Sequence, residues 1–178
     1  MAMNKIIYFL LAIAVAFLSG CATSASQNAM SIGVQDVPIK LNTDLKEKIY
    51  IRNVTGGKET NPLWTSQVDN VSFKGALDQS LTIAGYKSKT AAEAKMQIDA
   101  SLQSIEQPLF GLTFDVKSTV LYTVNSESGQ KVFPVTATGS ATPSDAFLGY
   151  ERLRIANERS IKENIKQFLQ AVTTFYNK

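Results

Sequence analysis

The sequence contains no histidine and only one cysteine, Cys21, among its 178 residues. One cysteine cannot form a disulfide within the chain. Without histidine there can be no Cys/His zinc site and no Ser-His or Cys-His nucleophile pair. The charges nearly balance, with 18 basic and 15 acidic residues, and the formal net charge of +3 is too mild to indicate a nucleic-acid partner. We therefore expect no metal, no cofactor and no catalytic residue of these classes.

The sequence also lacks an apolar run long enough to cross a membrane. Its longest run extends from Ile6 to Leu18 after a basic start at Lys5, and a transmembrane helix needs roughly 20 residues. A run of this length is typical of the central region of a secretory signal peptide. We therefore predict that residues 1–20 are a signal peptide.

The residues that end this run resemble the lipobox of bacterial lipoproteins, and they read Leu18-Ser19-Gly20-Cys21. The resemblance implies that a signal peptidase recognises Leu18, Ser19 and Gly20 and cleaves before Cys21. The Cys21 thiol would then carry a diacylglyceryl group and its amine would carry palmitate. At ~0.8 kcal/mol per buried CH₂, three acyl chains would anchor the protein almost permanently.

The residue after the lipobox cysteine is Ala22, not aspartate. In enteric-type bacteria, the resemblance then implies sorting to the inner leaflet of the outer membrane, with the protein facing the periplasm. Residues 21–45 are mostly small and polar, which predicts a lipidated N-terminus followed by a tether. A short edge strand could form at 37–41 within it. Residues 46–178 are long enough for one folded domain.

Within this domain the hydrophobic pattern alternates between strand and helix periods. Helical spacing places Phe73, Leu77 and Leu81 on one face, with Gly85 after the last turn. Alternating apolar and polar residues predict strands with one wet face. The expected elements are a strand at 49–54, a helix at 66–84, strands at 96–103, 112–124 and 132–141, and a helix that follows Asp145 and ends near Phe175, with Gly149 as a possible break.

This order predicts an α+β fold of the form β-α-β-β-β-α. Three consecutive strands joined by short turns should pair antiparallel. Two helices should then pack on one face of a roughly four-stranded, mainly antiparallel sheet, because each strand offers only one apolar face. Pro134 lies inside the last strand and indicates that this strand is at an edge.

Four stretches of this domain resemble the YajG-type family of small outer-membrane lipoproteins. The layout is also similar, more loosely, to LPS-assembly lipoproteins and to auxiliary lipoproteins of ABC transporters. The resemblance implies a two-helix sandwich of the anticodon-binding-domain type with no enzyme activity. The stretches are Phe73-Lys74-Gly75-Ala76-Leu77, Leu81-Thr82-Ile83-Ala84-Gly85-Tyr86, Ile98-Asp99-Ala100-Ser101-Leu102 and Ser160-Ile161-Lys162-Glu163-Asn164-Ile165.

Two groups of polar residues are functional candidates. Asp99, Glu106 and Asp115 are the carboxylates near the strands that could form an acid/base pair, but their polar neighbours favour a solvated surface. The basic residues from Arg152 to Lys166 could meet lipid phosphates or an acidic partner, but a solvated helix face is the favoured interpretation. Ser140 has no histidine to activate it.

The loop residues Trp64, Leu109 and Phe110 are the candidates for an interface, because loop aromatics can anchor a partner. The leading hypothesis is a non-catalytic accessory lipoprotein that binds a protein of an envelope assembly or transport system. One alternative is a lipid or glycolipid carrier with a cavity between helices and sheet. A second is an enzyme that uses carboxylates alone. The carrier's cavity would be lined by Phe114, Val116, Val120, Leu169 and Val172.

Overall fold

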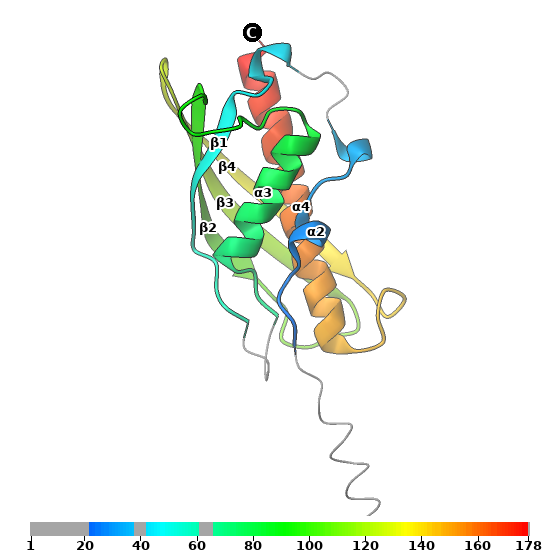
Figure 1. The fold of residues 1–178 in the computed structure, drawn as a ribbon. Coiled ribbons are helices and arrows are strands. Elements are labelled where there is room, and N and C mark those ends of the chain that lie inside the picture. Colours follow the sequence, from blue (N-terminus) through cyan, green and yellow to red (C-terminus); the bar gives the residue numbers. More distant parts are fainter. Residues whose placement is uncertain (1–21, 38–41, 61–65, 178) are drawn as a thin grey trace, which may run out of the picture.

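The computed structural model describes residues 22–37, 42–60 and 66–177 (Figure 1). The predicted signal peptide, Cys21 and Trp64 lie outside the described residues. The elements in chain order are α2 (Gln27–Met30), η1 (Val34–Asp36), η2 (Thr43–Leu45), β1 (Ile49–Thr55), α3 (Asn70–Ile83), β2 (Met96–Glu106), β3 (Phe114–Ser126), β4 (Gly129–Ala141) and α4 (Gly149–Tyr176).

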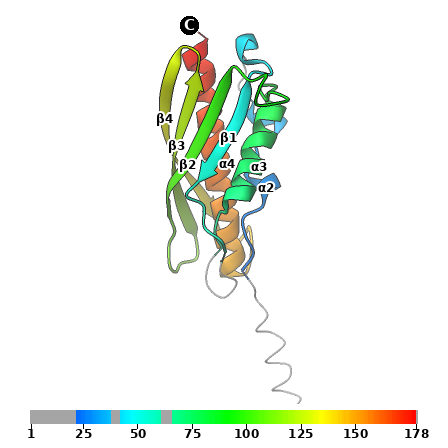
Figure 2. The ribbon, with the colours of Figure 1, turned by 60° about the vertical axis from the view of Figure 1, so that its left-hand side comes forward.

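The four strands form one sheet in the order β1-β2-β3-β4, and α3 and α4 cover the same face of it (Figures 1 and 2). β2 pairs antiparallel with β3, and β3 pairs antiparallel with β4. β1 pairs parallel with β2, because the chain returns through α3 before it enters the neighbouring strand. The predicted α+β class and its mainly antiparallel sheet are confirmed.

Both long helices begin later than the sequence predicts. α3 starts at Asn70, where Asp69 accepts a hydrogen bond from the Ser72 N–H at 2.7 Å. The predicted start at Ser66 is wrong, because the Ser66 carbonyl instead accepts a hydrogen bond from the Asn157 side chain of α4. α4 starts at Gly149, so this glycine begins the helix and does not break it.

The strand predictions are correct in which face is buried, but one boundary is wrong. Along β3 the even-numbered residues from Phe114 to Val124 are buried, as the alternation predicts. Leu112, which the prediction placed on this buried face, precedes the strand and is 75 % exposed. β4 lies at the edge of the sheet and carries Pro134 at an exposed position, which agrees with the edge assignment.

α4 contributes the largest part of the core from the helical layer. Its predicted apolar stripe, Ile161, Ile165, Phe168, Leu169 and Val172, is buried throughout. The Phe168 ring stacks on Tyr122 of β3 with a centroid distance of 4.0 Å. Burial raises the pKa of Tyr122 well above its usual value of 10.0.

The chain before β1 differs from the predicted tether. Ala22, Ala25, Met30, Ile32 and Leu45 are all buried, and all except Ala22 belong to the main core cluster. Figure 1 shows this segment lying along α3 and α4. Its small polar residues indicated a tether, but alanine side chains are short enough to be fully buried where segments approach closely. The expected edge strand at 37–41 falls mostly outside the described residues.

Candidate functional site

The described part of the chain begins at Ala22, directly after the predicted lipidation site. Ala22 is only 6 % exposed. The Ala25 N–H donates a hydrogen bond of 3.1 Å to the carbonyl of Gln67, in the loop before α3. A chain attached at Cys21 would therefore enter the packed domain within one residue.

The carboxylates of Glu158 and Asp36 form the polar contacts between this N-terminal segment and α4. Glu158, which is 5 % exposed, accepts a hydrogen bond of 2.9 Å from the Ser26 N–H and one of 2.8 Å from Arg154. Asp36 forms an ion pair of 2.9 Å with Lys162. The Ser26–Glu158 and Asp36–Lys162 contacts join residues far apart in sequence, so they fix the start of the domain relative to α4.

The Asp36 contact should make stability depend on pH. Burial alone would raise the pKa of Asp36, but the hydrogen bond from the Gly33 N–H and the ammonium groups of Lys162 and Lys166 outweigh it. The net effect lowers the pKa below its usual 3.8. Asp36→Asn should lower the free energy of unfolding by about 0.5–1 kcal/mol near pH 7.

A lowered folded-state pKa gives a contribution that is present above the unfolded value and is lost as the pH falls through the folded value. The difference between wild type and Asp36→Asn should therefore shrink below about pH 4. Urea unfolding at several pH values measures this difference, with the exposed Asp44→Asn as control. A difference that stays constant down to pH 2 would contradict the assignment.

Large apolar side chains are exposed in two loops, which we call the apolar loop end. The first loop, between β2 and β3, exposes Leu109 (92 %), Phe110 (86 %) and Leu112 (75 %). The second, between β4 and α4, exposes Phe147 (91 %) and Leu148 (45 %). The structure thus leaves two of the three predicted interface residues, Leu109 and Phe110, uncovered. Trp64 lies outside the described residues.

The sequence pattern does not identify three members of the apolar loop end. It predicts a strand at Leu112 and a helical region at Phe147 and Leu148. A shared local pattern could have identified them, because Leu109-Phe110-Gly111 and Phe147-Leu148-Gly149 both place two large apolar residues before a glycine. Glycine punctuation of this kind marks loops and element boundaries.

Arg152 holds the two loops of the apolar loop end together. Its guanidinium Nη1 donates hydrogen bonds to the carbonyls of Ala146 (3.0 Å) and Phe147 (2.6 Å). The same guanidinium lies over the ring of Phe114, 5.4 Å from its centroid, where the first loop enters β3. The second loop is also tied by an ion pair of 2.7 Å between Asp145 and Arg159. Arg159 and the Thr142 N–H lower the pKa of Asp145.

The remaining basic residues of α4 are also engaged with the protein itself. Arg159 donates to the Ser140 carbonyl at 2.7 Å, and Lys166 lies 3.7 Å from Glu163. The guanidinium of Arg152 is nearly buried. On the helix face that the sequence favoured as solvated, Arg159 (49 %), Lys162 (33 %) and Lys166 (32 %) stay partly exposed, and each of them is also paired with a carboxylate.

The three candidate carboxylates are separated by their partners. Asp99 pairs with Arg52 of β1, Glu106 lies 3.4 Å from Lys117, and Asp115 accepts a hydrogen bond from Ser140. Each carboxylate thus has its own partner, and no two of them share a hydrogen bond or a bridging residue. Within the described residues there is also no group of three or more acidic or cysteine side chains placed to hold a metal ion.

The core offers no support for the ligand cavity that the carrier hypothesis requires. All five proposed lining residues are buried, and they divide between two apolar clusters: Phe114 and Val116 in one, Val120, Leu169 and Val172 in the other. α4 lies so close to β4 that a Cβ on Gly139 would fall 2.1 Å from the Ser160 nitrogen. A ligand at these positions would have to displace the helix.

No family model matches the chain, and no curated protein matches it. Among the described residues, no helix has the length and apolar character needed to cross a bilayer. Several solved structures are similar to the chain. One is a protein from Caulobacter crescentus proposed to be a lipoprotein, with 13% identity and a TM-score of 0.44 over 71% of this chain and 90% of that one.

A hypothetical protein from Chlamydia trachomatis has 10% identity and a TM-score of 0.46, over 74% of this chain and 95% of that one. A protein from Xanthomonas campestris in the DUF330 family has 9% identity and a TM-score of 0.46, over 88% of this chain and 83% of that one. Identities and TM-scores this low transfer no function to this chain. The likeness to the YajG-type family stays a prediction from the sequence.

Proposed function

We propose that this chain is a lipid-anchored, non-catalytic lipoprotein of the bacterial cell envelope, whose domain binds a protein of an envelope assembly or transport system. The observation that carries the proposal is the position of Ala22. It follows the lipobox residues Leu18-Ser19-Gly20-Cys21, and it is already buried in the domain. Cleavage before Cys21 would thus leave the lipid attached one residue before the first buried side chain of the domain.

The absence of histidine supports a binding role over catalysis, because it removes the commonest general base and the usual activator of serine nucleophiles. The candidate carboxylates have separate partners, as described above, and the basic residues of α4 are occupied by internal contacts. What the domain offers instead is the face of its sheet opposite α3 and α4, which no described helix covers (Figure 2).

The anchor is tested by the mass of the protein and by its fractionation. Wild-type protein expressed with its own signal peptide should begin at Cys21, carry a diacylglyceryl and an acyl group, and leave membranes only in detergent. Cys21→Ala should carry no lipid and keep residues 1–20, because the thiol that accepts the lipid is gone. Intact mass spectrometry distinguishes the two products. An unmodified Cys21 thiol in membranes would contradict the proposal.

The partner is tested by crosslinking in intact cells, followed by pull-down of the tagged protein from membranes. We expect one envelope protein to be recovered with the wild type and not with Cys21→Ala, because only the lipidated form is delivered to the right surface. Recovery of a defined lipid with no protein would contradict the accessory role and favour the carrier.

A further inference from the structure

We infer that the apolar loop end inserts into the lipid surface to which Cys21 is anchored, so that the domain contacts the bilayer directly. The inference rests on the proposed lipidation of Cys21 and adds a second membrane contact made by the folded domain. The residues concerned are Leu109, Phe110 and Leu112 from the first loop and Phe147 and Leu148 from the second.

Very little chain separates the predicted lipid attachment point from the packed domain. Consecutive Cα atoms are about 3.8 Å apart, so Cys21 must lie next to Ala22. Ala22 is buried, and the backbone at Ala25 and Ser26 is hydrogen-bonded to Gln67 and Glu158. A lipidated chain with these contacts cannot hold its domain away from the membrane as a flexible tether would.

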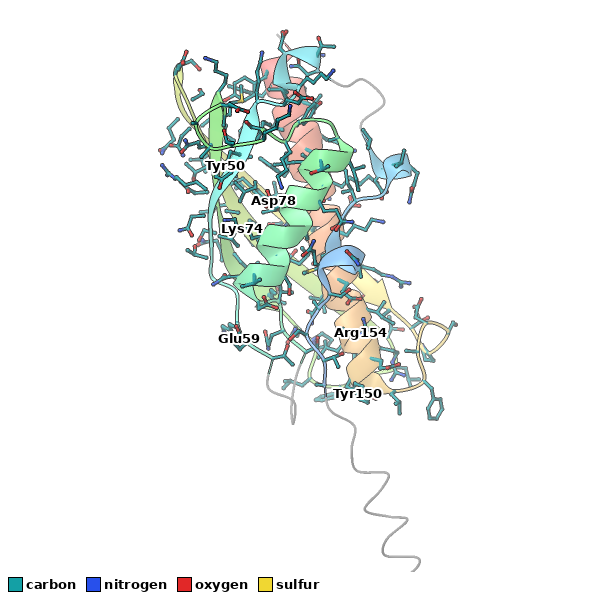
Figure 3. The ribbon with its side chains drawn as sticks, viewed as in Figure 1. Tyr50, Glu59, Lys74, Asp78, Tyr150 and Arg154 are labelled. Carbon is teal, nitrogen blue, oxygen red and sulfur yellow. The ribbon has the colours of Figure 1, made fainter. Side chains whose placement is uncertain are left out.

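The apolar loop end lies at the same end of the molecule as this attachment point. In Figures 1 and 2 the segment that begins at residue 22, both loops and the N-terminus of α4 are all at the lower end, and the C-terminus is at the upper end. Figure 3 places Tyr150, in the first turn of α4, at this lower end. Tyrosine is enriched at the level of lipid headgroups.

The chemistry of the two loops fits an apolar surface and not a charged one. Residues 107–113 contain no charged side chain, and Asp145 is the one charged residue among residues 142–148. Asp145 forms an ion pair with Arg159, with 2.7 Å between the two side chains. Exposed apolar side chains clustered at one place mark contact sites for membranes or proteins. A lipid surface is favoured here because the anchor already brings one to this end of the domain.

The loops are also held in place for such a contact. Arg152 binds the carbonyls of Ala146 and Phe147 and covers the Phe114 ring, so its charge is directed into the protein and away from the exposed tips. Two carbonyls and an aromatic ring thus surround the guanidinium, so it does not have to follow the tips into the apolar part of the bilayer.

The test uses the full chain, lipidated and reconstituted into vesicles of phosphatidylethanolamine and phosphatidylglycerol. Because lipidation consumes the only native thiol, one introduced cysteine can be labelled uniquely with an environment-sensitive NBD dye. Thr113→Cys and Ser144→Cys place the dye in the two loops without removing an apolar residue. Ser128→Cys, in the exposed turn between β3 and β4, is the control at the other end.

Spin-labelled acyl chains should quench the dye at residues 113 and 144 at least twofold and leave the dye at residue 128 unchanged. Replacing both Phe110 and Phe147 with serine should bring quenching at residue 113 down to the control level. Val34→Ser, which removes an exposed valine of η1, should not. This pair of variants shows that quenching depends on the apolar tips and not on the anchor alone.

Equal quenching at residues 113 and 128 in vesicle-bound protein would overturn the insertion while leaving lipidation intact. Protein that fails to float with the vesicles would overturn both, because the insertion rests on the anchor. Disulfide-linked dimers through Thr113→Cys would assign the loops to a second copy. Protection of the dye only in the presence of an envelope protein would assign them to that partner, and either result would overturn the inference.

Discussion

Replacing Gly139 with alanine should lower the free energy of unfolding by about 2–3 kcal/mol, because it overpacks a closed contact. A Cβ at this position would lie 2.1 Å from the Ser160 nitrogen and 2.5 Å from the Ala156 oxygen. Both atoms belong to the backbone of α4, so neither can rotate away. α4 would have to shift from β4, which would disturb the packing of Phe168 and Ile165 beneath it.

A loss of stability on Gly139→Ala would distinguish a closed contact from an open strand position. At a strand position with free space, Gly→Ala commonly stabilises a protein by about 0.4–1 kcal/mol, because it restricts the unfolded chain. Urea unfolding of the detergent-solubilised protein, followed by circular dichroism, measures the change. Thr138→Ala, at the adjacent exposed position, should change stability by less than about 0.5 kcal/mol. A stabilised Gly139→Ala protein would disprove the close contact.

Asn164→Ala should destabilise the protein by about 2–4 kcal/mol, because it leaves buried polar groups without partners. The Asn164 side chain is fully buried and accepts a hydrogen bond of 2.9 Å from the Tyr122 hydroxyl. It also donates to the carbonyls of Ser118 (3.2 Å) and Val135 (3.1 Å). One amide therefore joins α4 to both β3 and β4.

A double-mutant cycle isolates the bond between Asn164 and Tyr122. Tyr122→Phe keeps the ring that stacks on Phe168 and removes only the hydroxyl. In the Tyr122→Phe background, Asn164→Ala should cost at least about 1 kcal/mol less than in the wild type, because no donor is then orphaned. Equal costs in the two backgrounds would show that the hydrogen bond contributes nothing.

The sequence alone predicted those features that depend on local periodicity. Alternation along β3 identified its buried face, and helical spacing identified the α4 stripe from Ile161 to Val172. A side chain's direction repeats every two residues in a strand and every 3.6 in a helix. The periodicity of the sequence therefore predicts which face is buried, but it does not identify the segment that packs on that face. The lipobox is likewise read from adjacent residues.

Only the tertiary structure shows which distant segment of the chain buries a given apolar face. Residues 22–45 look like a tether in composition, yet Met30 and Ile32 complete the core. The close approach at Gly139 and the Asn164 network join residues that no sequence period relates.

The same holds for the apolar loop end. Its two loops are separated along the chain by β3 and β4, and they reach the same end because Phe114 at the start of β3 pairs with Ala141 at the end of β4. Arg152 of α4 then contacts Phe114 and the Phe147 carbonyl. Local periodicity could show that Leu109 and Phe110 lie in a loop. That they face the same end as the Cys21 attachment point followed only from the folded chain, because the burial of Ala22 and the antiparallel strands place both there.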